Sequence, residues 1–121
     1  MKQFSLGMAI LAFVFSLSGC NMGKVRYDNT VRLETNRSYT IPFSGPAKDS
    51  QVAIEASAPE SFNIEVVFDE NIGKSKPLAF KSDTRSYGGT VVIPAGKPFS
   101  IILTSRSAKE TQVTVRANGV E

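Results

Sequence analysis

The chain has 121 residues, with 14 lysines and arginines against 11 aspartates and glutamates, and 41% of its residues are hydrophobic. This composition is typical of a globular protein, and the length suits a single domain. The chain has no histidine, so it lacks the commonest general base and metal ligand. Its single cysteine excludes an internal disulfide and a thiolate metal cluster. We therefore expect neither a cofactor nor a metal site.

The first twenty residues have the pattern of a secretory leader. Lys2 precedes an uncharged, mostly apolar run over residues 4–17. A transmembrane helix needs about 20 apolar residues, so this run is too short to span a bilayer and suits the central part of a signal peptide. The run ends in Leu17-Ser18-Gly19-Cys20, where small residues precede the one cysteine of the chain.

This ending resembles the lipobox of bacterial lipoproteins. The resemblance implies cleavage before Cys20, a thioether-linked diacylglycerol on its sulfur and acylation of the freed amine. Two or three acyl chains, at about 0.8 kcal/mol per buried methylene, hold a protein stably at a bilayer. Asn21 stands where an aspartate would be the usual inner-membrane retention signal, which favours the periplasmic side of the outer membrane.

These features divide the chain into a signal peptide over residues 1–19, a lipidated tether over residues 20–30 and a folded domain over residues 31–121. Loss of Lys2 with the leader leaves 14 − 1 = 13 basic residues against 11 acidic ones. A nearly neutral, exported domain is not expected to bind nucleic acid.

Period-two alternation of apolar and polar residues dominates the folded domain, and it predicts β-strands rather than helices. About eight short strands are expected, over residues 30–34, 38–43, 51–57, 62–69, 78–81, 90–94, 99–103 and 111–118. Strands of this length and spacing predict an all-β fold, a two-sheet antiparallel β-sandwich of the jelly-roll or immunoglobulin-like kind.

Residues with turn propensity separate these strands. Asn36-Arg37 suits a hairpin, and residues 58–61 suit a four-residue connection between two neighbouring strands. The inward-facing side chains of the strands should form the core. These are Tyr39, Ile41, Phe43, Val52, Ile54, Phe62, Ile64, Val66, Phe68, Phe80, Val91, Ile93, Phe99, Ile101, Leu103, Val113 and Val115.

Two stretches of the domain are similar to bacterial pre-peptidase C-terminal domains. One is the turn and strand over residues 88–96, with the Pro94-Ala95-Gly96 sequence, followed by the strand over residues 99–103; the other is the opening strand over residues 37–41. The Asp-rich central strand of that family has no counterpart in residues 62–69. The resemblance implies a secreted jelly-roll module that binds or assists folding without catalysis.

Candidate sites for chemistry are few. Glu55 and Glu65 face outward on two strands that residues 58–61 would join as a hairpin, so their carboxylates could act as a glycosidase pair. No apolar or aromatic residue flanks them on that face and no tryptophan is available to stack a sugar, so a solvated sheet face is the simpler explanation of both residues. Asp69-Glu70-Asn71 offers oxygen ligands for calcium, but Lys74 and Lys76 nearby oppose a cation. We expect no catalytic residue and no metal ligand.

An interaction surface is the remaining possibility. Val67, Val92 and Ile102 fall on the outward phase of their strands, and exposed apolar side chains often mark docking surfaces. Residues 49–73 contain six acidic residues and no basic one, whereas basic residues predominate over residues 74–116. Either the two sets form a dipolar surface, or they pair across strands and stabilise the sheet. The basic residues expected on the surface are Lys97, Arg106 and Arg116.

The sequence therefore predicts a membrane-anchored envelope lipoprotein, lipidated at Cys20, that acts by binding and is not an enzyme. Its partner would be an envelope protein or a glycan, in an accessory, exclusion, immunity or inhibitor role. The alternatives are a carbohydrate-active module using Glu55 and Glu65, and a calcium-dependent adhesion module.

Overall fold

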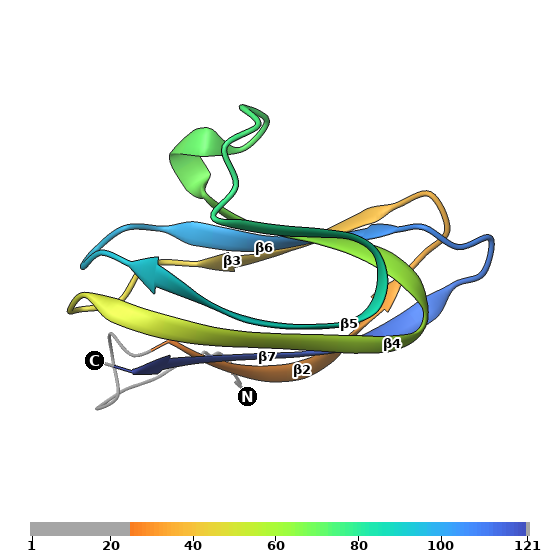
Figure 1. Cartoon of the computed structure of the whole chain (residues 1–121), viewed down its shortest axis with the longest axis horizontal. Coiled ribbons are helices and arrows are strands. Elements are labelled where there is room, and N and C mark those ends of the chain that lie inside the picture. The colour runs from red at the N-terminus through yellow and green to blue at the C-terminus, as the bar shows by residue number, and fades with distance from the viewer. Residues whose placement is uncertain (1–24, 121) are drawn as a thin grey trace, which may run out of the picture.

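The computed structural model describes residues 25–120, which form six strands and one short 3-10 helix (Figure 1). In chain order the elements are β2 (Arg26–Leu33), β3 (Ser38–Phe43), β4 (Ser50–Phe68), η1 (Asp69–Asn71), β5 (Ala79–Ile93), β6 (Phe99–Ser105) and β7 (Thr111–Val120). All strand pairs are antiparallel. The strand order is β2-β7-β4-β6-β3, and β5, which is not on this path, pairs with β4. This sheet folds over on itself, so the all-β sandwich predicted from the sequence is confirmed.

Two long strands, β4 and β5, belong to both layers of the sandwich. Residues 51–57 of β4 pair with β7 on one side and with residues 86–92 of β5 on the other. Residues 62–68 of β4 pair with β6 and with the first part of β5. We call the layer that contains β2, β7, residues 50–57 of β4 and residues 86–93 of β5 layer A. Layer B contains β3, β6, residues 62–68 of β4 and residues 79–84 of β5.

A bend in β4 carries the chain from layer A to layer B, as the curved ribbons of β4 and β5 in Figure 1 show. The β4–β5 register shifts between Ser57 and Phe62 and again between Phe62 and Ile64. Pro59 cannot donate a hydrogen bond, so a regular ladder cannot run through this point. The four-residue connection expected at residues 58–61 is therefore wrong: these residues bend one continuous strand.

The eight expected strand segments are nevertheless all present. Two of them are the halves of β4, and the segments expected at residues 78–81 and 90–94 lie near the two ends of β5. The connections β2–β3, β3–β4, β5–β6 and β6–β7 each pass from one layer to the other, which is the wiring of a jelly roll. The expected hairpin at Asn36-Arg37 is one of these crossings. There Asn36 adopts φ 60°, and the Arg37 amide donates to the Glu34 carbonyl at 3.1 Å.

The N-terminal part of the domain begins earlier than expected. Strand β2 starts at Arg26, so residues 26–30 of the expected tether lie in the sheet, paired with β7. The Gly119 amide donates to the Val25 carbonyl at 2.8 Å, which extends this pairing by one residue. The leader and residues 20–24 of the expected tether, Cys20 included, lie outside the described residues.

The core fills the space between the two layers. It contains Phe62 and Phe99 as its largest fully buried side chains, and both halves of β4 contribute to it. Most of the expected core is confirmed, with Phe43 and Phe68 half-buried at its margin. The prediction omitted further members of this cluster: Val25, Val31, Leu33, Ala56 and Ala117.

Two expected core residues are exposed. Phe80 has 55% of its surface exposed, because it pairs with Glu65, whose neighbours Ile64 and Val66 face inward. Phe80 therefore points out from layer B. Tyr39 is 40% exposed although it pairs with buried Leu103, since β3 is the outermost strand of its layer.

Val67 was expected on the surface, but it is fully buried. It belongs to the outward phase of β4 and is not part of the central cluster. The segment that follows β4, including η1, lies on this outer side of layer B (Figure 1). The Leu78 amide returns to the Val66 carbonyl, so the segment closes beside Val67.

A row of aromatic rings joins the two layers between β2 and β3. Tyr27 of β2 meets the Phe43 ring edge-on at 5.8 Å, and Phe43 stacks on Phe99 at 4.7 Å. Burial raises the pKa of the Tyr27 phenol above its ordinary value of 10.0, and a hydrogen bond from Asn29 partly offsets this. The neutral phenol is therefore the form that the fold favours.

This burial predicts a loss of stability at alkaline pH. The folded state holds the Tyr27 proton more tightly than the unfolded state. The contribution of the neutral Tyr27 phenol to the free energy of unfolding is therefore complete below the unfolded pKa of 10.0, and it is lost as pH rises through the raised pKa of the folded state. Tyr27→Phe keeps the ring but has no proton to lose. The stability difference between wild type and Tyr27→Phe, from urea unfolding at about pH 8 and about pH 11, should shift in favour of the variant at the higher pH. A difference that is independent of pH would contradict the burial.

The β3–β4 and β5–β6 connections lie against each other at one end of the sandwich. The Gly96 amide donates to the Pro46 carbonyl at 2.7 Å, and the Ala95 amide donates to Asp49 Oδ1 at 2.8 Å. Gly45 adopts φ +97°, and a Cβ there would lie 2.8 Å from both the amide nitrogen and the carbonyl oxygen of Lys97. Only glycine permits this approach of two backbones.

Gly45→Ala should therefore destabilise the domain strongly. The positive φ costs an alanine about 1–2 kcal/mol, and the clash with the Lys97 backbone raises the total to about 3 kcal/mol. Gly73→Ala is the matched control, because Gly73 has φ +80° but open space around its Cβ position. Urea unfolding of both variants measures the difference, and equal losses would contradict the close packing of the two connections.

Candidate functional site

Four neighbouring strands, β5, β4, β7 and β2, together build the outer face of layer A. Cross-strand registers place Gly88, Glu55, Arg116 and Asp28 in one row across β5, β4, β7 and β2. The next row contains Ser86, Ser57, Thr114 and Thr30, and the row on the other side contains Thr90, Ala53, Asn118 and Arg26. All twelve residues are exposed.

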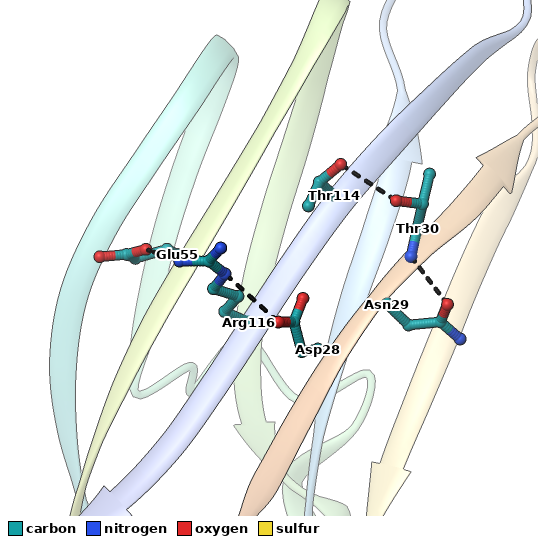
Figure 2. Close-up of polar contacts among 6 residues, drawn as sticks. All are labelled: Asp28, Asn29, Thr30, Glu55, Thr114 and Arg116. Carbon is teal, nitrogen blue, oxygen red and sulfur yellow. Dashed lines mark hydrogen bonds and ion pairs between the residues drawn. The ribbon is translucent and has the colours of Figure 1, made fainter.

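Arg116 occupies the centre of this face, between two carboxylates (Figure 2). Its Nε lies 3.5 Å from Asp28 Oδ2, and its Nη1 lies 4.0 Å from Glu55 Oε1. Beside this row, the Thr30 and Thr114 hydroxyls are 3.1 Å apart. The face thus combines a guanidinium donor, two carboxylate acceptors and paired hydroxyls within two adjacent rows.

The ion pairs of Arg116 leave its hydrogen-bonding capacity available. The side chains of Arg116, Asp28 and Glu55 are 57%, 68% and 69% exposed. Exposed pairs at such distances typically contribute between 0 and about 1 kcal/mol to stability. A partner can therefore replace these contacts at little cost to the fold.

A shallow hollow of about 490 Å³ opens beside Arg116. Glu55, Ser57, Ser86, Thr114 and Arg116 contribute its polar rim, and Ala56, Tyr87 and Gly88 complete its lining. A Cβ at Gly88 would meet nothing within 4 Å, so the missing side chain leaves open space. The shape suits recognition of polar groups from outside rather than enclosure of a small molecule.

The residues expected to form an interaction surface do not lie together. Arg116 is on the face described above, and Val92, 62% exposed, lies near one end of the same face beside Gln51. Ile102 is half-buried on the outer face of layer B, opposite Glu65. Arg106 is exposed in the β6–β7 connection, and Val67 is buried.

Lys97 takes part in contacts within the molecule. Its ammonium nitrogen lies 3.0 Å from Glu70 Oε2 and 4.7 Å from the centre of the Phe68 ring. Together with the pairing of Arg116 to Glu55, this contact favours the alternative in which the acidic and basic parts of the chain pair with each other. A dipolar surface is not needed to explain either residue.

Glu55 and Glu65 are not brought together. Because β4 bends rather than turning back, Glu55 lies on the outer face of layer A and Glu65 on that of layer B. Asp69 and Glu70 of the expected calcium loop already contact Ser100 Oγ, at 2.8 Å, and Lys97. Over residues 25–120 no group of three or more carboxylate or cysteine side chains is arranged to hold a metal ion.

Sequence reasoning missed most of the residues around Arg116. Asp28, Ser57, Ser86, Gly88 and Thr114 come from four strands that are distant in the chain. In the sequence these residues could be recognised only by the outward phase of each strand, and the order of the strands was needed to bring them together.

Among the described residues, no helix is long and apolar enough to cross a membrane.

Comparison with known proteins identifies the fold and no family. No family model and no curated protein matches the chain. The structure is similar to the Yersinia pseudotuberculosis-derived mitogen (TM-score 0.60, 8% identity, 78% of this chain and 86% of that chain). It is also similar to the pre-peptidase C-terminal domain of a Bacillus anthracis collagenase (0.59, 6%, 75% and 89%).

A third similar structure is Aeromonas hydrophila PliG, a periplasmic inhibitor of g-type lysozyme (TM-score 0.55, 12% identity, 81% of this chain and 89% of that chain). At these identities the likeness concerns the fold alone. The expected resemblance to pre-peptidase C-terminal domains is confirmed at that level, and the protein belongs by its architecture among jelly-roll-like β-sandwiches.

Proposed function

We propose that the protein is a lipid-anchored bacterial envelope protein that acts by binding a polar partner through the outer face of layer A, and that it is not an enzyme. The partner is an envelope protein or glycan, and the location is the periplasmic side of the outer membrane. The observation that carries the binding role is the exposed row of Asp28, Arg116 and Glu55, which lies beside the row of serine and threonine hydroxyl groups on the same face.

The anchor rests on the lipobox-like Leu17-Ser18-Gly19-Cys20. The fold supports this arrangement, because β2 begins only six residues after Cys20. Extended residues span up to about 3.6 Å each, so the tether holds the sandwich within about 20 Å of the bilayer surface. A partner in the same membrane or in the adjacent periplasm is then within reach.

The binding role is supported by the form of the surface. Exposed arginine and carboxylate groups with neighbouring hydroxyls suit hydrogen bonding to polar surfaces, and Arg is enriched at protein interfaces. One structural neighbour is a periplasmic lysozyme inhibitor, so this fold accompanies protein binding in the envelope elsewhere. The separation of Glu55 from Glu65 argues against the glycosidase alternative, which needs two carboxyl groups within about 10 Å.

The anchor predicts a specific mass for the mature protein. Intact-mass spectrometry of the membrane fraction should find a chain that begins at Cys20 and carries a diacylglycerol with an added acyl group. Cys20→Ala should keep the leader and lose the lipid, since the sulfur is the attachment point. A wild-type chain with an intact leader, or with a free Cys20 thiol, would contradict the anchor.

The proposed binding face predicts that Arg116 contributes more to capture of the partner than Arg32 does. Arg116→Ala should reduce capture of the partner from detergent-solubilised envelopes by about tenfold or more, because arginines near the centre of an interface are enriched among the residues that carry most of the binding energy. Arg32→Ala is the matched control for the central position of Arg116, because Arg32 is also an exposed arginine in an ion pair, with Glu110 at 2.8 Å, but lies at the margin of the same face and outside the hollow.

The two variants should have the same thermal stability to within about 1 kcal/mol, because both ion pairs are exposed. Treatment of the captured material with protease or with glycosidases tells whether the partner is a protein or a glycan. Equal recovery of the partner with Arg116→Ala and Arg32→Ala would refute a contact centred on Arg116, and recovery equal to wild type for both variants would refute the proposed face.

A further inference from the structure

The folded-over sheet has three edge strands among the described residues. These are β2 in layer A, β3 in layer B, and β5, which pairs with β4 alone and so forms an edge in both layers. The backbone groups on an edge are a template for pairing with another strand, and proteins usually block this with charges, prolines, bulges or short strands.

Two of these edges, and the first half of the third, carry such blocks. Strand β2 has three charged residues on its outer face: Arg26, Asp28 and Arg32. Strand β3 is only six residues long and contains Pro42. The first half of β5 contains Lys81, Asp83 at φ 53°, and Arg85, together with the register shifts opposite the bend of β4.

The second half of β5 carries none of these blocks. The Thr84 hydroxyl contacts both the carbonyl and the amide of Ser86, at 2.6 and 3.2 Å, which closes the edge at that point. From there residues 87–93 run in unbroken register with β4, without a charged residue, a proline or a bulge. We call residues 87–93 the open edge.

Few large side chains project from the outer face of the open edge. A Cβ on Gly89 would lie 2.5 Å from the Tyr87 hydroxyl oxygen, so the Tyr87 side chain lies along the strand over Gly89. Gly88 contributes no side chain, and Thr90 and Val92 are exposed on the outer face. Nothing in the described part of the chain other than β4 is paired with this segment.

We propose that the open edge pairs with the open edge of a second copy of this chain, in antiparallel orientation about a two-fold axis. A second copy fits because the segment is neutral: self-pairing meets no like-charge repulsion, and the two edges have the same length and twist by symmetry. Layer A of the two copies would join into one sheet of eight strands, with both Arg116 faces on the same side.

The experiment uses the full chain with two different C-terminal tags, co-expressed and extracted in detergent, with one tag captured and the other measured. Wild-type copies should recover each other. Thr90→Lys in both copies should lower this recovery by about tenfold, because two lysines are then forced close together across the two-fold axis. Thr90→Glu in both copies should do the same.

Co-expression of Thr90→Lys with Thr90→Glu should restore recovery, which a variant that merely misfolds or binds less to a detergent micelle would not do. Thr30→Lys, on the opposite edge of the same layer, should recover its own copy as wild type does. Arg116→Ala should also keep self-recovery, so this proposal and the proposed binding face fail separately.

Three results would overturn the second-copy assignment. Wild-type copies fail to recover each other, or Thr90→Lys copies recover each other as wild type does, or the lysine–glutamate combination does not restore the loss. Recovery of a different polypeptide that is lost with Thr90→Lys, without self-recovery, would assign the open edge to a strand of another protein instead.

Discussion

The whole structure depends on one strand that serves both layers. Strand β4 contributes Val52, Ile54 and Ala56 to the core from layer A, and Phe62, Ile64 and Val66 from layer B, and the bend at residues 58–61 joins the two sets. Each half lies between two hydrogen-bonded neighbours, so displacing the bend would disturb the pairing of β4 with β5, β6 and β7 in both layers. Phe62, fully buried immediately after the bend, holds the turn of the strand against the core. A small domain without a disulfide gains its stability from such continuous burial.

The same bend decides what chemistry the surface can offer. It sends Glu55 and Glu65 to opposite outer faces, so two carboxylates that are ten residues apart never share a site. It places Glu55 instead beside Arg116 of β7, which also contacts Asp28 of β2. The resulting face is exposed, polar and shallow, and these properties suit contact with another macromolecule. Because β5 follows β4 through both layers, the bend also creates the long edge whose second half lacks charges and prolines.

Local pattern was enough to locate nearly all strand segments, because side-chain alternation follows from the pleat of each strand. It was not enough to separate a bend from a turn: Ala58-Pro59-Glu60-Ser61 has turn composition, and only the pairing of Ser57 with Ser86 and of Phe62 with Thr84 shows that the strand continues. Phe80 and Val67 were misplaced for a related reason, since alternation gives the phase of a strand but not what covers its outer face. Arg116 was recognised as a surface residue, whereas its partners Asp28 and Glu55 come from strands that are 88 and 61 residues away and depend on strand order.

Strand β4 is one bent strand whose two halves pair with different neighbours, and nuclear magnetic resonance of the isotope-labelled protein tests this pairing directly. Cross-strand proton contacts should join Ser57 to Ser86 and to Thr114, and should join Phe62 to Thr84 and to Ser105. A hairpin closed by residues 58–61 would instead join Ser57 to Phe62 and Ala56 to Asn63. Observation of that second set of contacts, in place of the first, would contradict the architecture and with it the placement of Arg116 between Asp28 and Glu55.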